Sequence, residues 1–168
     1  MPAITIHIAD PASNEAQACI DAYISELQTR FTEGFDPANS VSANPHELTP
    51  PNGWFILARQ DGHPVGCGAL KAQPDGTGEI KRMWVAHSVR NQGIATRLLN
   101  YLETLAAQAG IDTLRLDTHR DLTQARAFYK RSGYAEIDAY NGNPYAHHWF
   151  EKRGIRQLYA DKPAGDAS

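Results

Sequence analysis

The sequence contains no run of about 18 apolar residues, so no segment of it is long enough to cross a membrane as a helix. Its first residues, MPAITIHIADP, lack the basic stretch and the apolar core that together make a secretory signal peptide. Only two cysteines are present, Cys19 and Cys67, and they lie far apart in the chain. This pattern favours two reduced structural thiols over a disulfide or a catalytic cysteine. We therefore expect a cytoplasmic protein.

The sequence also lacks a large excess of charge of one sign and a spacing typical of metal ligands. The 16 basic and 19 acidic residues give a formal net charge of −3, so bulk attraction to nucleic acid is not expected. The seven histidines are scattered, and the adjacent His147 and His148 would point to opposite faces of a strand, so we expect no metal site. The 168 residues suit a single domain, which we place at residues 1–156, with a C-terminal tail over 157–168.

What the chain does contain is a strand that runs into a helix, over residues 79–105. The strand half is rich in apolar and aromatic residues with high strand propensity. A short polar crossing, residues 86–93, joins the two halves. In the helix half, apolar residues recur at the helical period and share one face: Ile94, Leu98, Leu102, Leu105 and Ala109.

The crossing predicts a site for a phosphate or a pyrophosphate. A helix N-terminus carries backbone N–H groups without an internal partner, and its dipole favours negative charge. Gly93 stands at the helix start, where a side chain would block the close approach of an anion, and Arg90 offers a positive fork suited to phosphate. Ile94, Ala95 and Thr96 keep the first turn free of acidic residues. This arrangement is typical of a phosphate cradle.

Two familiar phosphate loops do not fit this segment. A P-loop has Gly-Lys-Ser or Gly-Lys-Thr at the helix start, where this chain has Gly-Ile-Ala at residues 93–95. The dinucleotide fingerprint requires three glycines within six residues, and neither residues 66–68 nor residues 76–78 continue in that way.

The remaining segments alternate between strand and helix patterns. Asp121 and Gln124 resemble a capping box at the start of the third helix. The stretch 34–53, rich in Pro, Asn and Ser, is either a lid or binding loop or a connection without a role. Strands two to four should form an antiparallel meander, and strands four and five, joined through a helix, should lie parallel. We expect strands over 4–8, 54–59, 65–71, 79–85, 114–118, 134–137 and 145–152, and helices between 14 and 31, 94 and 109, and 124 and 132.

Two blocks of this sequence resemble the GNAT acetyltransferase superfamily. Residues 90–95, Arg-Asn-Gln-Gly-Ile-Ala, match the family's Gln/Arg-x-x-Gly-x-Gly/Ala loop position by position. Residues 116–118, Leu-Asp-Thr, followed by Ala125 and residues 128–134, are similar to the family's second block. The resemblance covers residues 3–154 and implies an α+β fold of α/β/α layers. Its mixed, mostly antiparallel seven-stranded sheet would be splayed between strands four and five. The family usually has two helices between strands one and two, where only one is obvious here.

The resemblance also implies acetyl-CoA as the co-substrate. The backbone of Met83, Trp84 and Val85 would bind the pantetheine arm like an added strand, and the Val85 N–H would polarise the acetyl carbonyl. The alternative for Met83 and Val85 is a place in the core, and both can hold because the proposed contacts use the backbone. Further coenzyme-binding residues implied by the resemblance are Arg90, Asn91, Gln92, Gly93, Ile94, Ala95, Thr96, Thr118, Gln124 and Phe128.

Two residues are candidates for proton transfer on the same resemblance. Tyr129 stands where the family usually has a tyrosine, the candidate general acid for the coenzyme A thiolate; the alternative is a packing tyrosine beside Phe128. Glu79 begins the central strand, where several members have a glutamate that accepts the amine proton through a water; the alternative is a solvated strand end.

We expect the acceptor to be a small polar amine or an amino-acid derivative. Direct attack by the amine, without a covalent enzyme intermediate, agrees with the absence of a convincing Cys/His or Ser/His pair. The alternative function is a non-catalytic module that senses coenzyme A. Family members are often homodimers, although the sequence reveals no dimer surface, and we expect no nucleic-acid or membrane partner. The candidate acceptor-binding groups are Phe31, Phe35, Tyr134, Tyr140, the stretch 34–53 and residues 145–149.

Overall fold

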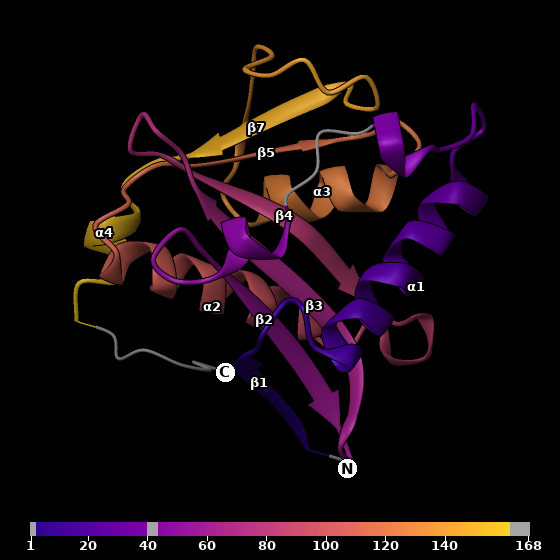
Figure 1. The fold of residues 1–168 in the computed structure, drawn as a ribbon. Coiled ribbons are helices and arrows are strands. Elements are labelled where there is room, and N and C mark those ends of the chain that lie inside the picture. Colours follow the sequence, from indigo (N-terminus) through magenta and orange to yellow (C-terminus); the bar gives the residue numbers. More distant parts are fainter. Residues whose placement is uncertain (1–2, 40–43, 162–168) are drawn as a thin grey trace.

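A computed structural model describes residues 3–39 and 44–161 (Figure 1). The described helices are α1 (Asn14–Arg30), α2 (Ile94–Gln108), α3 (Thr123–Arg131) and α4 (Ile155–Leu158). The described strands are β1 (Ile4–Ile8), β2 (Gly53–Gln60), β3 (His63–Ala72), β4 (Gly78–Val85), β5 (Leu114–Thr118), β6 (Ala135–Ile137) and β7 (His148–Lys152). The predicted order of elements is confirmed, and the short C-terminal α4 is an addition to it.

The strands form one seven-stranded sheet in the order β1-β2-β3-β4-β5-β7-β6. Strands β1 to β4 pair antiparallel, β4 and β5 pair parallel, and β7 pairs antiparallel with both β5 and β6. The predicted meander and the predicted parallel pair are therefore confirmed. The last strand is shorter than expected, because residues 145–147 precede it as an irregular segment.

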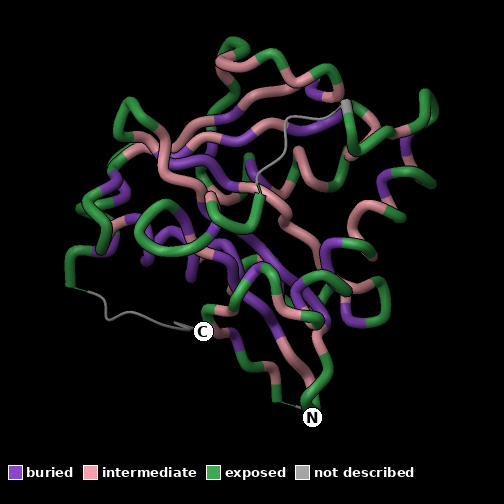
Figure 2. The backbone as a smooth tube through the Cα atoms, in the orientation of Figure 1, coloured by how far each residue is buried: buried purple, intermediate pink, exposed green. Residues whose placement is uncertain are grey.

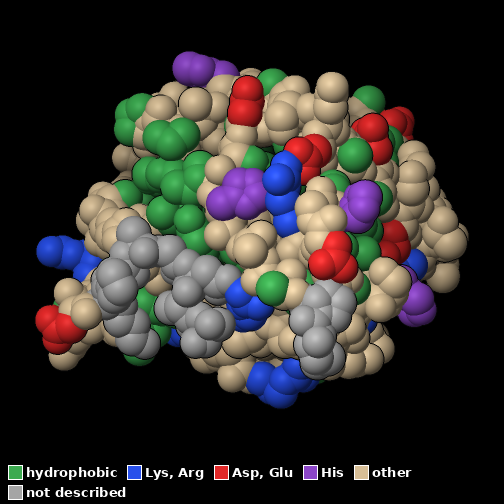
Figure 3. Space-filling model, turned by 90° about the horizontal axis from the view of Figure 1, so that it is seen from below, with side chains coloured by type: hydrophobic (Ala, Val, Ile, Leu, Met, Phe, Trp, Pro, Cys, Tyr) green, Lys and Arg blue, Asp and Glu red, His purple; other side chains and the backbone are tan. Residues whose placement is uncertain are grey.

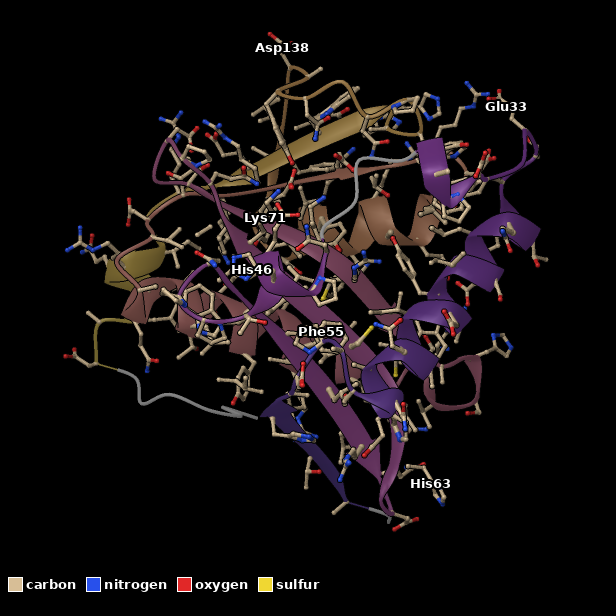
Figure 4. All side chains as sticks on the ribbon, viewed as in Figure 1. Glu33, His46, Phe55, His63, Lys71 and Asp138 are labelled. Atoms are coloured by element: carbon tan, nitrogen blue, oxygen red, sulfur yellow. The ribbon has the colours of Figure 1, made fainter. Side chains whose placement is uncertain are left out.

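The two long helices cover opposite faces of this sheet (Figure 1). Along β2, Phe55 and Leu57 join a core with the buried side of α1, whereas Ile56 and Ala58 join a larger core with α2. This alternation follows from the period of two along a strand. Buried segments accordingly concentrate in the sheet and α2 (Figure 2), and Phe55 lies inside the molecule while His63 projects from the β2–β3 hairpin (Figure 4).

Strands β4 and β5 separate almost as soon as they pair. Their ladder holds only the pairs Gly78 with Leu114 and Glu79 with Arg115. Further along, the register of β4 against β3 shifts between Cys67 and Ala69. Opposite this shift Arg82 has a φ of 56°, as expected of an extra residue in a β-bulge. The predicted splay between strands four and five is thus confirmed.

Helix α1 begins after a residue whose side chain caps it, whereas helix α3 begins without a side-chain cap. Ser13 caps α1 by accepting a hydrogen bond from the Ala16 N–H. The capping box predicted at Asp121 is wrong. Helix α3 begins at Thr123 without a side-chain cap, because the Asp121 carboxylate accepts bonds from the N–H and hydroxyl of Thr32 at 3.1 and 3.3 Å.

The stretch 34–53 is more ordered than its composition indicates. It contains 3₁₀ turns at Pro37–Asn39 and Pro45–Leu48, and the second is closed by a reciprocal capping box between Asn44 and Glu47. Leu48 is buried in the core beneath α1. The family usually has a second helix between strands one and two. In the described part of this stretch only these two 3₁₀ turns take its place, and residues 40–43 lie outside the described residues.

The two cysteines, distant in sequence, meet in space. Cys19 on α1 and Cys67 on β3 are buried free thiols, and Cys19 Sγ lies 3.9 Å from the carbonyl oxygen of Gly66, the residue before Cys67. Cys67 Sγ also lies 3.1 Å from the Arg82 carbonyl oxygen, which it reaches at the bulge of β4. The thiols therefore join α1, β3 and the distorted part of β4.

The described chain has a mixed surface, and none of its helices is long and apolar enough to cross a bilayer. On the face drawn in Figure 3, acidic and basic side chains are interspersed. At the C-terminus, folded structure continues through α4 to the buried Tyr159, so this residue of the predicted tail belongs to the core. Residues 162–168 lie outside the described part.

A buried carboxylate fixes this C-terminal segment to the sheet. Glu103 on α2 has no exposed surface, and it accepts bonds at 2.7 Å from the hydroxyls of Tyr134 and Tyr159. Lys152 on β7 completes the cluster, with its Nζ 3.1 Å from Glu103 Oε1.

Replacing Glu103 by Ala should lower the free energy of unfolding by about 3–5 kcal/mol, because it leaves the Lys152 ammonium largely buried without its counter-charge. Urea unfolding at pH 7 measures the loss. The control is Glu136→Ala, which removes a carboxylate that is 45% exposed and paired with His148; it should cost less than about 0.5 kcal/mol. Equal losses in the two variants would contradict this account.

Candidate active site

Two cavities meet where β4 and β5 separate. The first, here called the α2 cavity, lies between α1, the end of β4, the start of α2 and α3. The second, the aromatic cavity, lies between α1, β4, β5 and the segments around Phe35 and Tyr145. Both are lined by Tyr23, Leu27, Met83, Leu122, Ala125 and Tyr129.

The start of α2 forms one end of the α2 cavity. Gly93 is the N-cap with a φ of 77°, and no side chain caps the helix. The first α-helical bond is donated by Arg97, so the N–H groups of residues 94–96 have no partner within the helix. An anion there would meet free donors and the positive end of the helix dipole.

Most of the residues predicted for the coenzyme are brought together here. Gln92 is exposed and lies outside the lining, and Thr118 lines the aromatic cavity instead. The α2 cavity is lined by Met83, Trp84, Val85, Arg90, Asn91, Gly93, Ile94, Ala95, Thr96, Gln124 and Phe128.

The Arg90 side chain is already engaged within the protein. Its Nε donates to the Val85 carbonyl oxygen at 3.0 Å, and its Nη2 forms an ion pair with Glu26 of α1. Trp84 Nε1 donates to the same carboxylate at 3.3 Å. Sequence reasoning missed Glu26, since nothing local links α1 to the crossing. A ligand phosphate bound by the remaining N–H donors of Arg90 would share the guanidinium with Glu26.

Backbone geometry places one amide proton in the gap between the strands. The Ala86 N–H donates to the Val65 carbonyl oxygen at 2.7 Å, and Val85 lies opposite Gly66. Successive N–H groups of a strand point to opposite sides. The Val85 N–H therefore points away from β3, toward the side from which β5 has diverged.

Two tyrosines stand at the junction of the cavities. Tyr129 on α3 is 7% exposed and packs against the rings of Phe128 and Phe150. Burial is the main cause that raises the pKa of the Tyr129 hydroxyl, which has no hydrogen-bond partner among the described residues. Tyr23 on α1 lines both cavities too, and burial raises its pKa to about 12. Sequence reasoning missed Tyr23 as a residue of the site.

A polar network forms one wall of the aromatic cavity. Glu79 is 6% exposed, so its reading as a solvated strand end is wrong. It accepts bonds from Tyr140 Oη at 2.7 Å and from Asn141 Nδ2 at 3.4 Å. The same Asn141 Nδ2 donates to Asp117 Oδ2 at 2.7 Å. Burial raises the pKa of the Asp117 carboxyl, while the bond from Asn141 opposes this.

Aromatic rings form the opposite wall. Phe31 stacks on His119 with ring centroids 3.7 Å apart, and Phe35 lies 4.7 Å from Tyr145. The Asp36 N–H donates to Tyr145 Oη at 2.8 Å, which joins the two segments across the cavity. Burial lowers the pKa of His119, so its ring is neutral near pH 7.

The two tyrosines predicted for the acceptor do not line this cavity. Tyr134 belongs to the Glu103 cluster and lines neither cavity, because its hydroxyl is directed to that buried carboxylate. Tyr140 reaches the cavity only through its bond to Glu79, and its ring lies beside the Arg115 guanidinium. Phe31 and Phe35 do line the cavity, as expected.

Comparison with known proteins identifies relatives over most of the chain. A family model described as the acetyltransferase (GNAT) family matches residues 20–134. IAA acetyltransferase of Azospirillum brasilense is 31% identical over 137 residues, which are 81% of this chain and 87% of that protein. Aminoalkylphosphonate N-acetyltransferase of Salmonella typhimurium is 34% identical over 130 residues, which are 74% of this chain and 82% of that protein.

Solved structures show the same fold. A GNAT-family acetyltransferase from Staphylococcus aureus aligns with a TM-score of 0.76 at 20% identity, over 90% of this chain and 99% of that one. A GNAT-family acetyltransferase from Elizabethkingia anophelis, with acetyl-CoA bound, aligns with a TM-score of 0.62 at 21% identity, over 89% of this chain and 97% of that one.

Replacing Gly93 by Val should weaken coenzyme A binding by about tenfold or more, because the side chain would stand where the diphosphate meets the helix N-terminus. Gly110→Val is the matched control at the other end of α2. Both glycines have positive φ, 77° and 81°, and open space around an added Cβ. Each variant should therefore lose about 1–2 kcal/mol of stability from backbone strain alone. Calorimetric titration with coenzyme A separates them, and equal affinities would argue against the cradle.

Proposed function

The chain belongs to the GNAT acetyltransferase family, and from this premise we propose that it transfers the acetyl group of acetyl-CoA to the primary amine of a small molecule. One observation carries the proposal: a cavity that ends at a helix N-terminus and a cavity with carboxylates and aromatic rings meet at the gap between β4 and β5. Such a junction brings two substrates together at one reacting centre.

The α2 cavity is the proposed site of acetyl-CoA. The N–H groups of residues 94–96 bind the diphosphate, and the backbone of residues 83–85 pairs with the pantetheine arm. The thioester then lies near the Val85 N–H, which donates to the carbonyl oxygen as that oxygen gains charge. Because the amide is fixed in the strand, little reorganisation accompanies the reaction.

The amine attacks from the aromatic cavity. It reacts as a neutral amine, so its ammonium form first gives a proton to a carboxylate in that cavity, for which the sequence predicts Glu79. The new C–N bond forms as the C–S bond breaks, and Tyr129 donates a hydrogen bond to the sulfur of the departing coenzyme A thiolate. The thiolate takes the surplus proton of the nitrogen and leaves as the thiol, so that a neutral amide remains. Its raised pKa keeps the hydroxyl protonated, which suits a donor.

The size and lining of the aromatic cavity support a small acceptor with a flat apolar part. The cavity encloses about 230 Å³, less than the roughly 300–1,000 Å³ of sites for drug-sized ligands. Phe31, Phe35 and Tyr145 offer ring surfaces to such a body, while Glu79 and Asp117 attract its ammonium group.

A thiol-release assay tests the proposed function. The protein is incubated with acetyl-CoA and a panel that contains 2-phenylethylamine, n-butylamine, several amino acids and 2-aminoethylphosphonate, while calorimetry measures coenzyme A binding. Release with at least one amine, and a higher kcat/KM for 2-phenylethylamine than for n-butylamine, is expected. Coenzyme A binding without release for any amine would instead support a sensor.

Replacing Tyr129 by Phe should lower kcat by about 10- to 100-fold and leave the affinity for coenzyme A within about threefold, because the lost donor acts on the leaving thiolate. Tyr23→Phe removes a hydroxyl at the same junction and serves as the control. Steady-state kinetics with 2-phenylethylamine compares the two. If Tyr23→Phe alone depresses kcat, the donor is Tyr23 and the assignment to Tyr129 is wrong.

A further inference from the structure

Resting on the proposed function, we propose that Asp117, and not Glu79, is the catalytic carboxylate that binds the ammonium group of the acceptor and takes its proton. Both carboxylates line the aromatic cavity, and a single amide, Asn141 Nδ2, donates to both of them. They differ in how many of their oxygen lone pairs are already used.

Glu79 has no acceptor capacity left for a substrate. An ionised carboxylate offers about four lone-pair sites. Oε1 accepts from Gln73 Nε2 at 3.2 Å and lies 3.1 Å from Lys81 Nζ. Oε2 accepts from Tyr140 at 2.7 Å and from Asn141 at 3.4 Å. A proton could be added only after one of these donors is displaced, and the charge is balanced by Lys81.

Asp117 retains open sites and forms no ion pair of its own among the described residues. Its Oδ2 accepts from Asn141 at 2.7 Å and its Oδ1 from Asn143 at 3.1 Å. Burial has the largest effect on the pKa of Asp117 and raises it, while the field of the Lys81 ammonium, which pairs with Glu79, lowers it. Two of its lone-pair sites thus remain for an ammonium group. The raised pKa of the Asp117 carboxyl, caused chiefly by burial, also makes it the better proton acceptor.

Asp117 lies in the cavity that leads to the junction. It lines the aromatic cavity together with Tyr23 and Tyr129, the two tyrosines that line both cavities. Tyr129 is more than nine-tenths buried, lines both cavities and has no hydrogen-bond partner among the described residues. An amine held by Asp117 therefore stands between the aromatic wall and the position proposed for the thioester.

The proposed step is balanced in protons. The ammonium group of the acceptor donates two N–H bonds to the Asp117 oxygens and passes one proton to the carboxylate, which becomes neutral. The free amine attacks the acetyl carbon, and the surplus proton of the resulting C–N adduct leaves with the coenzyme A thiol. Asp117 returns its own proton to solvent when the product departs. Asn141 and Asn143 hold the Asp117 side chain throughout and act as positioning residues.

The test compares Asp117→Asn, Glu79→Gln and the matched control Asp75→Asn with two acceptors that share a benzyl-type body. 2-Phenylethylamine is cationic at pH 7, whereas O-benzylhydroxylamine is neutral there and needs no base before attack. Asp75 lies in the β3–β4 turn, is exposed, and lines neither cavity. Asp117→Ser is made in parallel, so that a folded variant without the carboxylate is available, and thermal unfolding confirms folding.

We expect Asp117→Asn to lower kcat/KM for 2-phenylethylamine by about 100-fold or more, and that for O-benzylhydroxylamine by less than about tenfold. Coenzyme A affinity should not change. Glu79→Gln should lower both values by a similar factor, and Asp75→Asn should lower neither. A merely structural role of Asp117 predicts equal losses of kcat/KM with the two acceptors, and that result would overturn the proposal. The proposal would also be overturned if Glu79→Gln, and not Asp117→Asn, showed a loss that depends on the acceptor. Activity of the wild-type protein with neither acceptor, nor with any other amine, would overturn the proposed function as well.

Discussion

The separation of β4 and β5 after two residue pairs is the constraint on which the rest of the site depends. Backbone amides in a folded protein need partners, and a strand that loses its neighbour presents them to whatever occupies the gap. The bulge at Arg82 turns β4 out of the ladder, and the Cys67 thiol holds the carbonyl of that residue. Because α2 begins a few residues later, a second set of unpaired N–H groups faces the same opening. One distortion thus creates both the space and the donors.

Three buried or half-buried carboxylates in this protein show how hydrogen-bond saturation separates structural from chemical roles. Glu103 is saturated by two hydroxyls and an ammonium group, and joins α2 to the C-terminal elements. Glu79 is equally saturated although it lines a cavity. Asp117, with two amide donors and open lone pairs, is the exception. Counting donors is a more direct guide to reactivity here than burial, because a carboxylate without a vacant lone pair cannot accept a proton from a substrate.

The sequence predicted those features that are local. The strand, polar crossing and helix of residues 79–105 lie within one short segment, so periodicity predicted the elements there. The predicted coenzyme-binding residues that line the α2 cavity came partly from the resemblance to a family. Contacts between segments that are distant in the chain could not be predicted from the sequence. Glu26 lies 64 residues from Arg90 in the chain, and it binds the guanidinium that the sequence assigned to a phosphate. Thr32 lies 89 residues from Asp121, and it binds the carboxylate that was predicted to cap α3. Tyr134 was misplaced for the same reason, since its partner Glu103 belongs to another element.

Because the two cavities share part of their lining, one ligand could occupy both of them. Under the proposed function, a single molecule that joins coenzyme A to an arylalkyl group through a short covalent bridge would pass through the junction at Tyr129 and fill both cavities at once. Linking the two parts makes the second contact intramolecular, so the tethered compound should bind far more tightly than either fragment alone. The bridge length of the compound that binds most tightly would measure the distance between the thioester site and the amine site.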